Sequence, residues 1–471
     1  MELHPSFFFV FLIVVVTLNY FFSARYRPLF ILLASIIFIG YLNLPSLIVV
    51  LFFSLINFYL AKNITGKKFK FLAALSLNIS AIIFFNFFNS STQGPEFEFH
   101  TAGFNIPHFI VSIGLSFYSL QNIAYITDIY FKRALPQTSI LNFFLYNSFF
   151  TKVISGPIMS PNEFMAQINS NKPSSEMISS GINRFVIGLL KKMVIADGLY
   201  PAVHAIFDSS NNYNGITTLI GVYLFTIQLY FDFSGYTDMA LGTAKMLGYN
   251  LKENFNLPFR STSITEFWRR WHISLINWFT NYIYYPIVYY LRAYKKIAVF
   301  IGIAATFLVS AIWHGLNFTF LLWAFCFIIY MSFELLTKAI RTNISRRFPP
   351  LVNKLFSIFI VFNGVCFSNI FFRSESAIRA FLLMKNILSN FIPANWLSDF
   401  VAPLANGGNL MEQFNFLITL LLMSFLLLFE RTINKKATAL KIDILYISIC
   451  VMLIMIFGVF NNTERFIYMQ F

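Results

Sequence analysis

The stretch IAVFIGIAATFLVSAIWHGLNFTFLLWAFCFIIYMSFELL (residues 297–336) contains two apolar runs that meet at a histidine and a glycine, His314 and Gly315. Each run is long enough to cross a bilayer as a helix, which takes about 17–25 residues. A glycine between the runs allows the chain to turn sharply. The sequence therefore predicts two membrane-spanning helices joined by a tight turn.

Apolar runs of similar length occur along the whole chain. Besides 297–314 and 318–337, they lie at residues 7–22, 28–42, 45–61, 71–89, 107–131, 185–206, 215–234, 352–372, 413–430 and 443–461. We expect about 11–12 transmembrane helices in an all-α integral membrane protein. Because no internal repeat or low-complexity linker divides the chain, residues 1–471 are predicted to form one domain.

The composition agrees with a membrane location. Of the 471 residues, 58% are hydrophobic and 11% are charged, whereas soluble domains have roughly 45–50% apolar and about 25% charged residues. This excludes a soluble enzyme, a disordered chain and a fibrous repeat. The formal net charge is +15. We expect the excess basic residues to contact anionic lipid headgroups and not nucleic acid. The three cysteines lie in apolar runs and predict neither disulfides nor a metal site.

The basic residues are distributed unevenly between alternate loops. If the spans alternate, only Arg373, Arg379, Lys385 and Arg465 lie on the side opposite all other Lys and Arg residues. The basic side is the cytoplasmic side by the positive-inside rule. Two cytoplasmic stretches do not resemble simple spans, because residues 132–184 are amphipathic and residues 245–296 combine basic residues with tryptophans and tyrosines. We expect interfacial and re-entrant helices there.

His314 is a candidate catalytic residue because it ends an otherwise apolar span. Ionisable groups inside a membrane protein are costly and are often functional. An imidazole is the usual general base near neutral pH. The alternative is a hydrogen-bonded histidine that only stabilises the helix end.

A second candidate segment is SITEFWRRWH (residues 263–272). Ser263 and Glu266 have the spacing of a capping box and predict the start of a helix. Helical spacing then places Trp268, Trp271 and His272 on one face of this helix. The two arginines, Arg269 and Arg270, point away from that face.

Two interpretations of this basic and aromatic helix remain open. It can be an interfacial anchor at the membrane surface. Alternatively, Trp268, Arg269 and Arg270 line the entrance for a phosphorylated donor, with His272 at its inner end.

Two aspartates, Asp232 and Asp238, occur at the cytoplasmic end of a predicted span. They are six residues apart and so do not share a helical face. We expect each to pair with a nearby Lys or Arg, because structural ion pairs are a common role for such carboxylates. No nucleophile elbow, phosphate-binding glycine loop or HExxH motif is present.

Several short motifs carry a more specific signal together than any one does alone. They are SFYSLQ (116–121), ISGP (154–157), QLYFDFSGYTDM (228–239), TEFWRRWHISL (265–275), WHG (313–315) and the aromatic ending FIYMQF (466–471). In this combination the chain resembles the membrane-bound O-acyltransferase (MBOAT) family, in the branch of bacterial alginate O-acetyltransferase and the D-alanyl transfer protein. The resemblance is concentrated in residues 110–330.

The resemblance implies a ring of helices around a central tunnel in a multi-pass protein of the bacterial inner membrane. It implies that His314 is the catalytic histidine and that His272 is the second active-site residue. An acyl thioester would enter from the cytoplasm, with acetyl-CoA as co-substrate and no bound cofactor. The acceptor would be a hydroxyl of an extracytoplasmic polysaccharide, and a separate extracytoplasmic acyltransferase would complete the transfer.

One motif departs from the family. Where relatives have Arg-Asp-Tyr and a glycine-rich turn, this chain has Thr280, Asn281 and Tyr282, followed by VYY at 288–290. This departure leaves the substrate open. One alternative is D-alanyl transfer from a carrier-protein thioester towards teichoic acid. The alternative of another class is a transporter, for which we find no repeat with paired broken helices.

Overall fold

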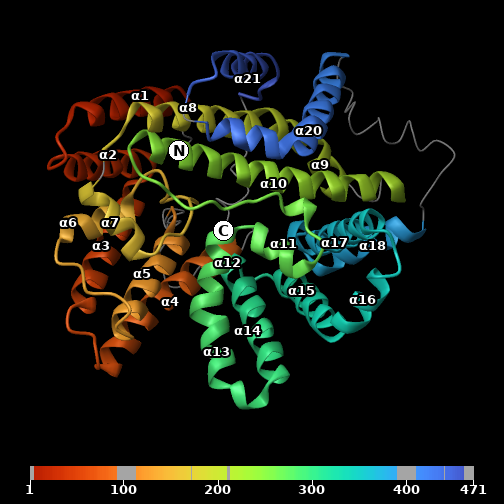
Figure 1. Cartoon of the computed structure of the whole chain (residues 1–471), viewed down its shortest axis with the longest axis horizontal. Helices are drawn as coiled ribbons and strands as arrows, with labels where there is room; N and C mark the ends of the chain where they lie inside the picture. The colour runs from red at the N-terminus through yellow and green to blue at the C-terminus, as the bar shows by residue number, and fades with distance from the viewer. Residues whose placement is uncertain are drawn as a thin grey trace, which may run out of the picture.

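The computed structural model of the chain describes residues 5–92, 113–170, 172–208, 213–389, 410–439 and 441–460. The described residues form helices and connecting turns, with no strand among them (Figure 1). This arrangement confirms the predicted all-α membrane fold. Residues 93–106 and the aromatic ending at 466–471 lie outside the described residues.

Helices of spanning length account for much of the predicted topology. Within the described ranges, seven are long and apolar enough to cross a membrane: α3 (Leu44–Ala61), α4 (Lys68–Thr92), α10 (Gly215–Met246), α14 (Lys296–His314), α15 (Phe318–Leu336), α17 (Pro350–Arg373) and α20 (Leu410–Ala437). Three shorter apolar helices accompany them: α1 (Pro5–Phe21), α2 (Arg27–Leu42) and α21 (Ile444–Phe457).

The two remaining predicted spans have a different form. The span predicted at 107–131 is described only from α5 (Leu115–Tyr130) onward. The span predicted at 185–206 is divided between three elements: α8 (Ser175–Leu190), a π-helical turn (Lys191–Ala196) and α9 (Asp197–Asp208). Shorter helices complete the described chain: α6 (Ile140–Ser148), α7 (Pro161–Ser170), α16 (Lys338–Ser345) and α18 (Ala377–Ser389).

Helix α10 lies at the centre of the fold and packs against α8, α9, α17 and α18 (Figure 1). Glycines let α8 and α10 touch along their backbones. A Cβ atom at Gly188 would lie 2.6 Å from the carbonyl oxygen of Gly235, and one at Gly242 would lie 2.6 Å from that of Gly181. Because any side chain would force the helices apart, these glycines fix how α8 meets α10.

The segment between α10 and α14 contains only short helices. They are a 3₁₀ turn (Pro258–Arg260), α11 (Ile264–Arg270), α12 (Ile273–Phe279), a π-helical turn (Thr280–Tyr284), α13 (Tyr285–Tyr290) and a further 3₁₀ turn (Arg292–Tyr294). None of them is long enough to span a bilayer. The segment therefore has the broken form predicted for residues 245–296.

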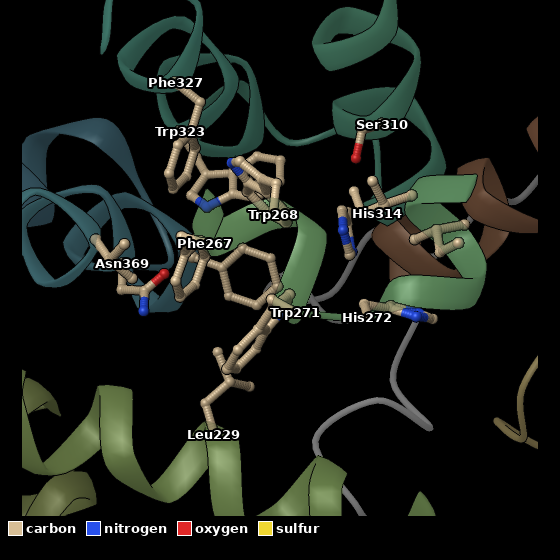
Figure 2. A pocket seen from close by; sticks show the side chains of 14 residues that line it. Leu229, Phe267, Trp268, Trp271, His272, Ser310, His314, Trp323, Phe327 and Asn369 are labelled. Carbon is tan, nitrogen blue, oxygen red and sulfur yellow. The ribbon is translucent and has the colours of Figure 1, made fainter. Parts of the chain in front are cut away.

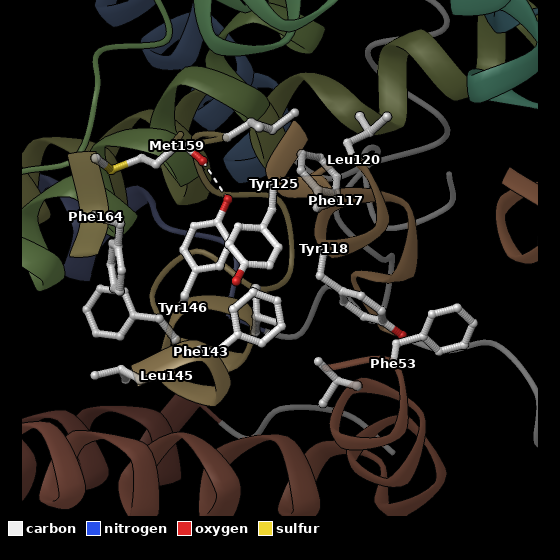
Figure 3. Close-up of a cluster of buried hydrophobic side chains, with 14 of the residues drawn as sticks. Phe53, Phe117, Tyr118, Leu120, Tyr125, Phe143, Leu145, Tyr146, Met159 and Phe164 are labelled. Carbon is white, nitrogen blue, oxygen red and sulfur yellow. Dashed lines mark hydrogen bonds between the residues drawn. The ribbon is translucent and has the colours of Figure 1, made fainter. Parts of the chain in front are cut away.

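A cluster of buried aromatic residues on α5 and α6 supports α12 from the N-terminal side (Figure 3). The Tyr146 hydroxyl donates to the carbonyl oxygen of Met159 at 2.9 Å. The neighbouring Ile158 amide donates to Ser274 Oγ at 3.0 Å, and Trp278 Nε1 donates to the carbonyl oxygen of Leu120 at 2.9 Å. These bonds hold α12 against the N-terminal half of the molecule.

Candidate active site

A small enclosed chamber lies between α10, α11, α12, α14, α15 and α17 (Figure 2). Its cavity volume is about 20 Å³. Six aromatic side chains and four polar ones dominate the lining: Phe267, Trp268, Trp271, Trp323, Phe327 and Phe372, with His272, Ser310, His314 and Asn369. The chamber therefore combines an apolar wall with a few polar groups, as small-molecule sites commonly do.

His314 reaches this chamber from the last turn of α14, as the sequence predicts. The backbone turns at Gly315, where φ is 151°. The imidazole is 6% exposed and packs against Trp323 and Phe372, with ring centroids 5.3 Å and 5.2 Å away. The end of the apolar span thus presents a buried imidazole to the chamber.

His272 lines the same chamber, but it does not lie within a helix. Helix α11 ends at Arg270, and His272 precedes α12 with a left-handed backbone (φ 44°, ψ 50°). The prediction that Trp268, Trp271 and His272 share one helical face is therefore wrong. The reason is local, because the backbone at Trp271 is already extended (φ −109°, ψ 130°) and the chain turns there.

The turn brings the two histidines to the same side of the chamber, whereas Trp268 and Phe327 lie across it (Figure 2). The His272 ring also packs edge-on against Phe233 at 4.7 Å. Burial lowers the pKa of His272 well below its usual value, and the neighbouring His314 lowers it further. Burial therefore favours the neutral form of the His272 imidazole.

The three residues predicted at a donor entrance are separated in the structure. Trp268 lines the chamber and packs against Phe327 with ring centroids 4.8 Å apart. Arg269 is exposed. Arg270 bonds to Glu266 at 2.7 Å and to the backbone oxygen of Asn256 at 3.2 Å.

The predicted capping box is present in part. Ser263 Oγ accepts from the backbone amide of Glu266 at 3.0 Å and begins α11. The Glu266 carboxylate bonds to the Thr262 amide at 2.8 Å instead of returning to Ser263. Burial raises the pKa of Glu266, but the hydrogen bonds from Thr262 and Arg270 together lower it by more, so the net effect is a lowered pKa.

Asp232 and Asp238 form ion pairs outside the chamber, which confirms their predicted structural pairing. Asp238 binds Arg184 on α8 at 2.9 Å and Lys191 at 2.7 Å. Asp232 binds Lys192 at 2.8 Å. The two carboxylates thus hold α10 to α8 and to the π-helical turn that follows it.

Sequence reasoning missed two polar residues, one on the chamber wall and one in contact with His272. Asn369 lines the chamber from α17 and donates to Thr226 Oγ1 at 3.2 Å. Asn254, in the loop before α11, contacts His272 through its side chain. Asn369 is a polar residue within an apolar span, which is a weak signal of function, and Asn254 has no signal in the sequence.

The model of the membrane-bound O-acyltransferase family matches residues 131–372. The chain is 30% identical over 393 residues to the probable alginate O-acetylase of Pseudomonas aeruginosa, covering 81% of this chain and 74% of that protein. It is 30% identical over 425 residues to a peptidoglycan O-acetyltransferase of Helicobacter pylori, covering 82% and 79%. It is also 29% identical over 277 residues to a teichoic acid D-alanyltransferase of Bacillus subtilis, covering 55% and 68%. The chain therefore belongs to the membrane-bound O-acyltransferase family and is a multi-pass acyltransferase.

Proposed function

We propose that this protein transfers an acetyl group from acetyl-CoA on the cytoplasmic side to a hydroxyl of an extracytoplasmic polysaccharide, in the inner membrane of a bacterium. The observation that carries the proposal is the pair of buried histidines, His272 and His314, in one small chamber. Membership of an acyltransferase family argues against the transporter alternative.

In this proposal His314 acts as the general base. It accepts the proton of the acceptor hydroxyl while the hydroxyl oxygen attacks the thioester carbonyl. The new C–O bond forms, the C–S bond breaks, and the thiol of coenzyme A leaves with a proton. His272 either positions the donor or stabilises the developing oxyanion.

The chamber favours acetyl over D-alanyl as the transferred group. No Asp or Glu is among the lining residues that the structure describes. A D-alanyl group would bring its ammonium into this chamber without a counter-ion, at a cost of several kcal/mol.

A second cavity supports a donor that approaches from the basic side. Its volume is about 350 Å³, and its charged lining residues are Arg184, Lys191 and Lys435 with Asp238 and Glu253, which pair with the first two cations. Tyr230 lines this cavity and packs against Trp271 of the chamber, with ring centroids 6.0 Å apart. In this proposal a phosphate of coenzyme A binds the exposed Lys435 at this cavity, with the thioester directed past the rings towards the histidines.

In this proposal Arg269 and Arg270 attract the donor as it approaches, since both lie on the expected cytoplasmic side. Arg270 contacts the loop at Asn256, which also lines the second cavity. Trp268 would instead contact the acyl end of the donor. Because the thioester works from one side of the membrane, we include an extracytoplasmic acyltransferase partner that completes the transfer to the polymer.

The donor and its side are tested in oriented vesicles prepared from the cell membrane, which retain the protein together with its extracytoplasmic partner. Radiolabelled acetyl-CoA, which does not cross membranes, is added outside inside-out or right-side-out vesicles that hold a polysaccharide acceptor. We expect acetyl transfer only when the cytoplasmic face is outward. Transfer from right-side-out vesicles would contradict the donor side, and transfer only from a D-alanyl carrier thioester would support the D-alanyl alternative.

His272→Ala is expected to reduce acetyl transfer at least about tenfold, which corresponds to 1.36 kcal/mol of transition-state stabilisation. The variant loses the buried imidazole beside Phe233 but keeps the helices on either side. Initial rates at several acetyl-CoA concentrations measure the effect, with membrane content of the variant as the control. Activity within about twofold of the parent would show that His272 has a structural role only.

A further inference from the structure

The backbone of His272 is held in an uncommon conformation by a neighbouring segment of the chain. A left-handed conformation is rare for a residue with a side chain, and in a buried site it persists only where surrounding contacts enforce it. Residues 254–256 supply these contacts. The Ile273 amide donates to the carbonyl oxygen of Asn254 at 2.9 Å, and the Asn256 amide donates to that of Arg270 at 2.9 Å.

The side chain of Asn254 adds a contact to the imidazole itself. Asn254 is fully buried, and its Oδ1 accepts from the Ser274 backbone amide at 3.0 Å. The same Oδ1 lies 3.4 Å from Nδ1 of His272. Asn254 therefore contacts both the first turn of α12 and the imidazole ring of His272, which precedes that helix.

These two contacts determine the direction of the bond to the imidazole. A backbone amide is always a donor, so the amide atom of Asn254 that faces Ser274 must be the oxygen. An amide oxygen only accepts, so the Nδ1 atom facing it must carry a hydrogen. In a neutral imidazole the proton is then absent from Nε2, which becomes a hydrogen-bond acceptor.

We propose that Asn254 is a positioning residue that fixes His272 in the Nδ1–H tautomer, so that Nε2 offers a lone pair to the acyl donor. The proposal rests on the acetyl-transfer function above and chooses between the two roles left open for His272. A neutral ring with an unprotonated Nε2 accepts a hydrogen bond from an N–H of the pantetheine arm. It does not donate one to an oxyanion.

The most direct test is the nitrogen NMR signature of His272 in the wild-type protein in lipid bilayers. Protein labelled with ¹⁵N-histidine is compared with the His272→Gln variant, so that the missing signals identify the ring. We expect a protonated Nδ1 and an unprotonated Nε2 at neutral pH. The opposite assignment would overturn the proposal whether or not any variant folds.

Enzyme kinetics provide the second test. Asn254→Ala is expected to lower kcat/KM for acetyl-CoA about 10- to 100-fold, because a small misplacement of a reacting group costs about this much. The matched control is Asn250→Ala, four residues away in the same loop and outside both cavities, where the side chain is exposed and only the backbone bonds to Gln167. Equal rates for the two variants would overturn the proposal.

Asn254→Asp tests positioning separately from simple loss of structure. The carboxylate still accepts from Ser274 and from Nδ1–H, so we expect this variant to retain more activity than Asn254→Ala. An anion beside the His272 ring favours its imidazolium form and so raises its pKa. Among the described chamber residues, His314 is the other titratable group. In the pH dependence of the acetyl-transfer rate, the fall in activity at acidic pH should therefore begin about one pH unit higher than in the parent. An unchanged pH dependence would contradict the contact between residue 254 and His272.

The outcomes separate this inference from the proposed function. If the wild-type protein transfers no acetyl group from acetyl-CoA, the proposed function fails, while the nitrogen signature still reports whether Asn254 fixes the tautomer. If the wild-type protein is active and Asn254→Ala behaves as Asn250→Ala does, only the positioning role fails.

Discussion

His314→Gln is expected to lower acetyl transfer by at least about 10²-fold, because general-base help contributes about 10²–10⁴-fold. Glutamine has a similar size and can form hydrogen bonds, but it does not accept a proton at neutral pH. The side chain lies at the end of α14 against Trp323 and Phe372. A polar group of similar size can keep these contacts while the chemistry is lost.

The measurement is the initial rate of acetyl transfer in vesicles, together with binding of acetyl-CoA. We expect donor binding and membrane content to remain near the parent values. His204→Gln is the matched control, because His204 is exposed on α9, where it pairs with Asp208 at 3.0 Å. If His314→Gln kept substantial activity, His314 would be a structural residue and the base would have to be sought first at His272.

Asp238→Asn is expected to destabilise the folded protein by about 3–5 kcal/mol, the cost of removing one partner from a buried ion pair. The substitution keeps the shape of the side chain but leaves Lys191 without the carboxylate that it binds at 2.7 Å. Arg184 keeps its second partner, Glu253. The loss therefore comes mainly from Lys191 and from the weakened contact between α8 and α10.

Thermal unfolding in detergent, followed by circular dichroism, measures this change. The control is Glu163→Gln, which removes a half-exposed ion pair to Lys252 at 2.7 Å. Such pairs contribute about 0–1 kcal/mol, so this control should unfold near the parent temperature. Equal unfolding temperatures for Asp238→Asn and the parent would show that the pair contributes no net stability.

The membrane fold could be predicted from the sequence because its signals are local and repeated. Apolar runs of spanning length and the uneven distribution of Lys and Arg each draw on many residues. The exceptions have physical causes. The span predicted at 185–206 contains Lys191 and Lys192, which the structure pairs with Asp238 and Asp232 on α10.

The candidate site was predictable only in its two histidines. His314 stands out because it interrupts an apolar run, and His272 because it follows a basic and aromatic segment. The turn at His272 was not predictable, since its spacing from Trp268 and Trp271 fits a helix equally well. The bonds that favour the turn come from Asn254, which lies 18 residues earlier in the chain.

The backbone contact between α8 and α10 has a consequence for motion in this protein. Two glycine contacts along one helix pair resist sliding and rotation, because either movement would drive side chains into the facing backbone. The two helices therefore move as one rigid body that carries Leu229 on the chamber wall and Asp238 beside the second cavity. Any widening of the 20 Å³ chamber to admit substrates must come from the opposite wall. We therefore expect α11 and the hairpin of α14 and α15 to shift, while α8 and α10 remain the fixed frame.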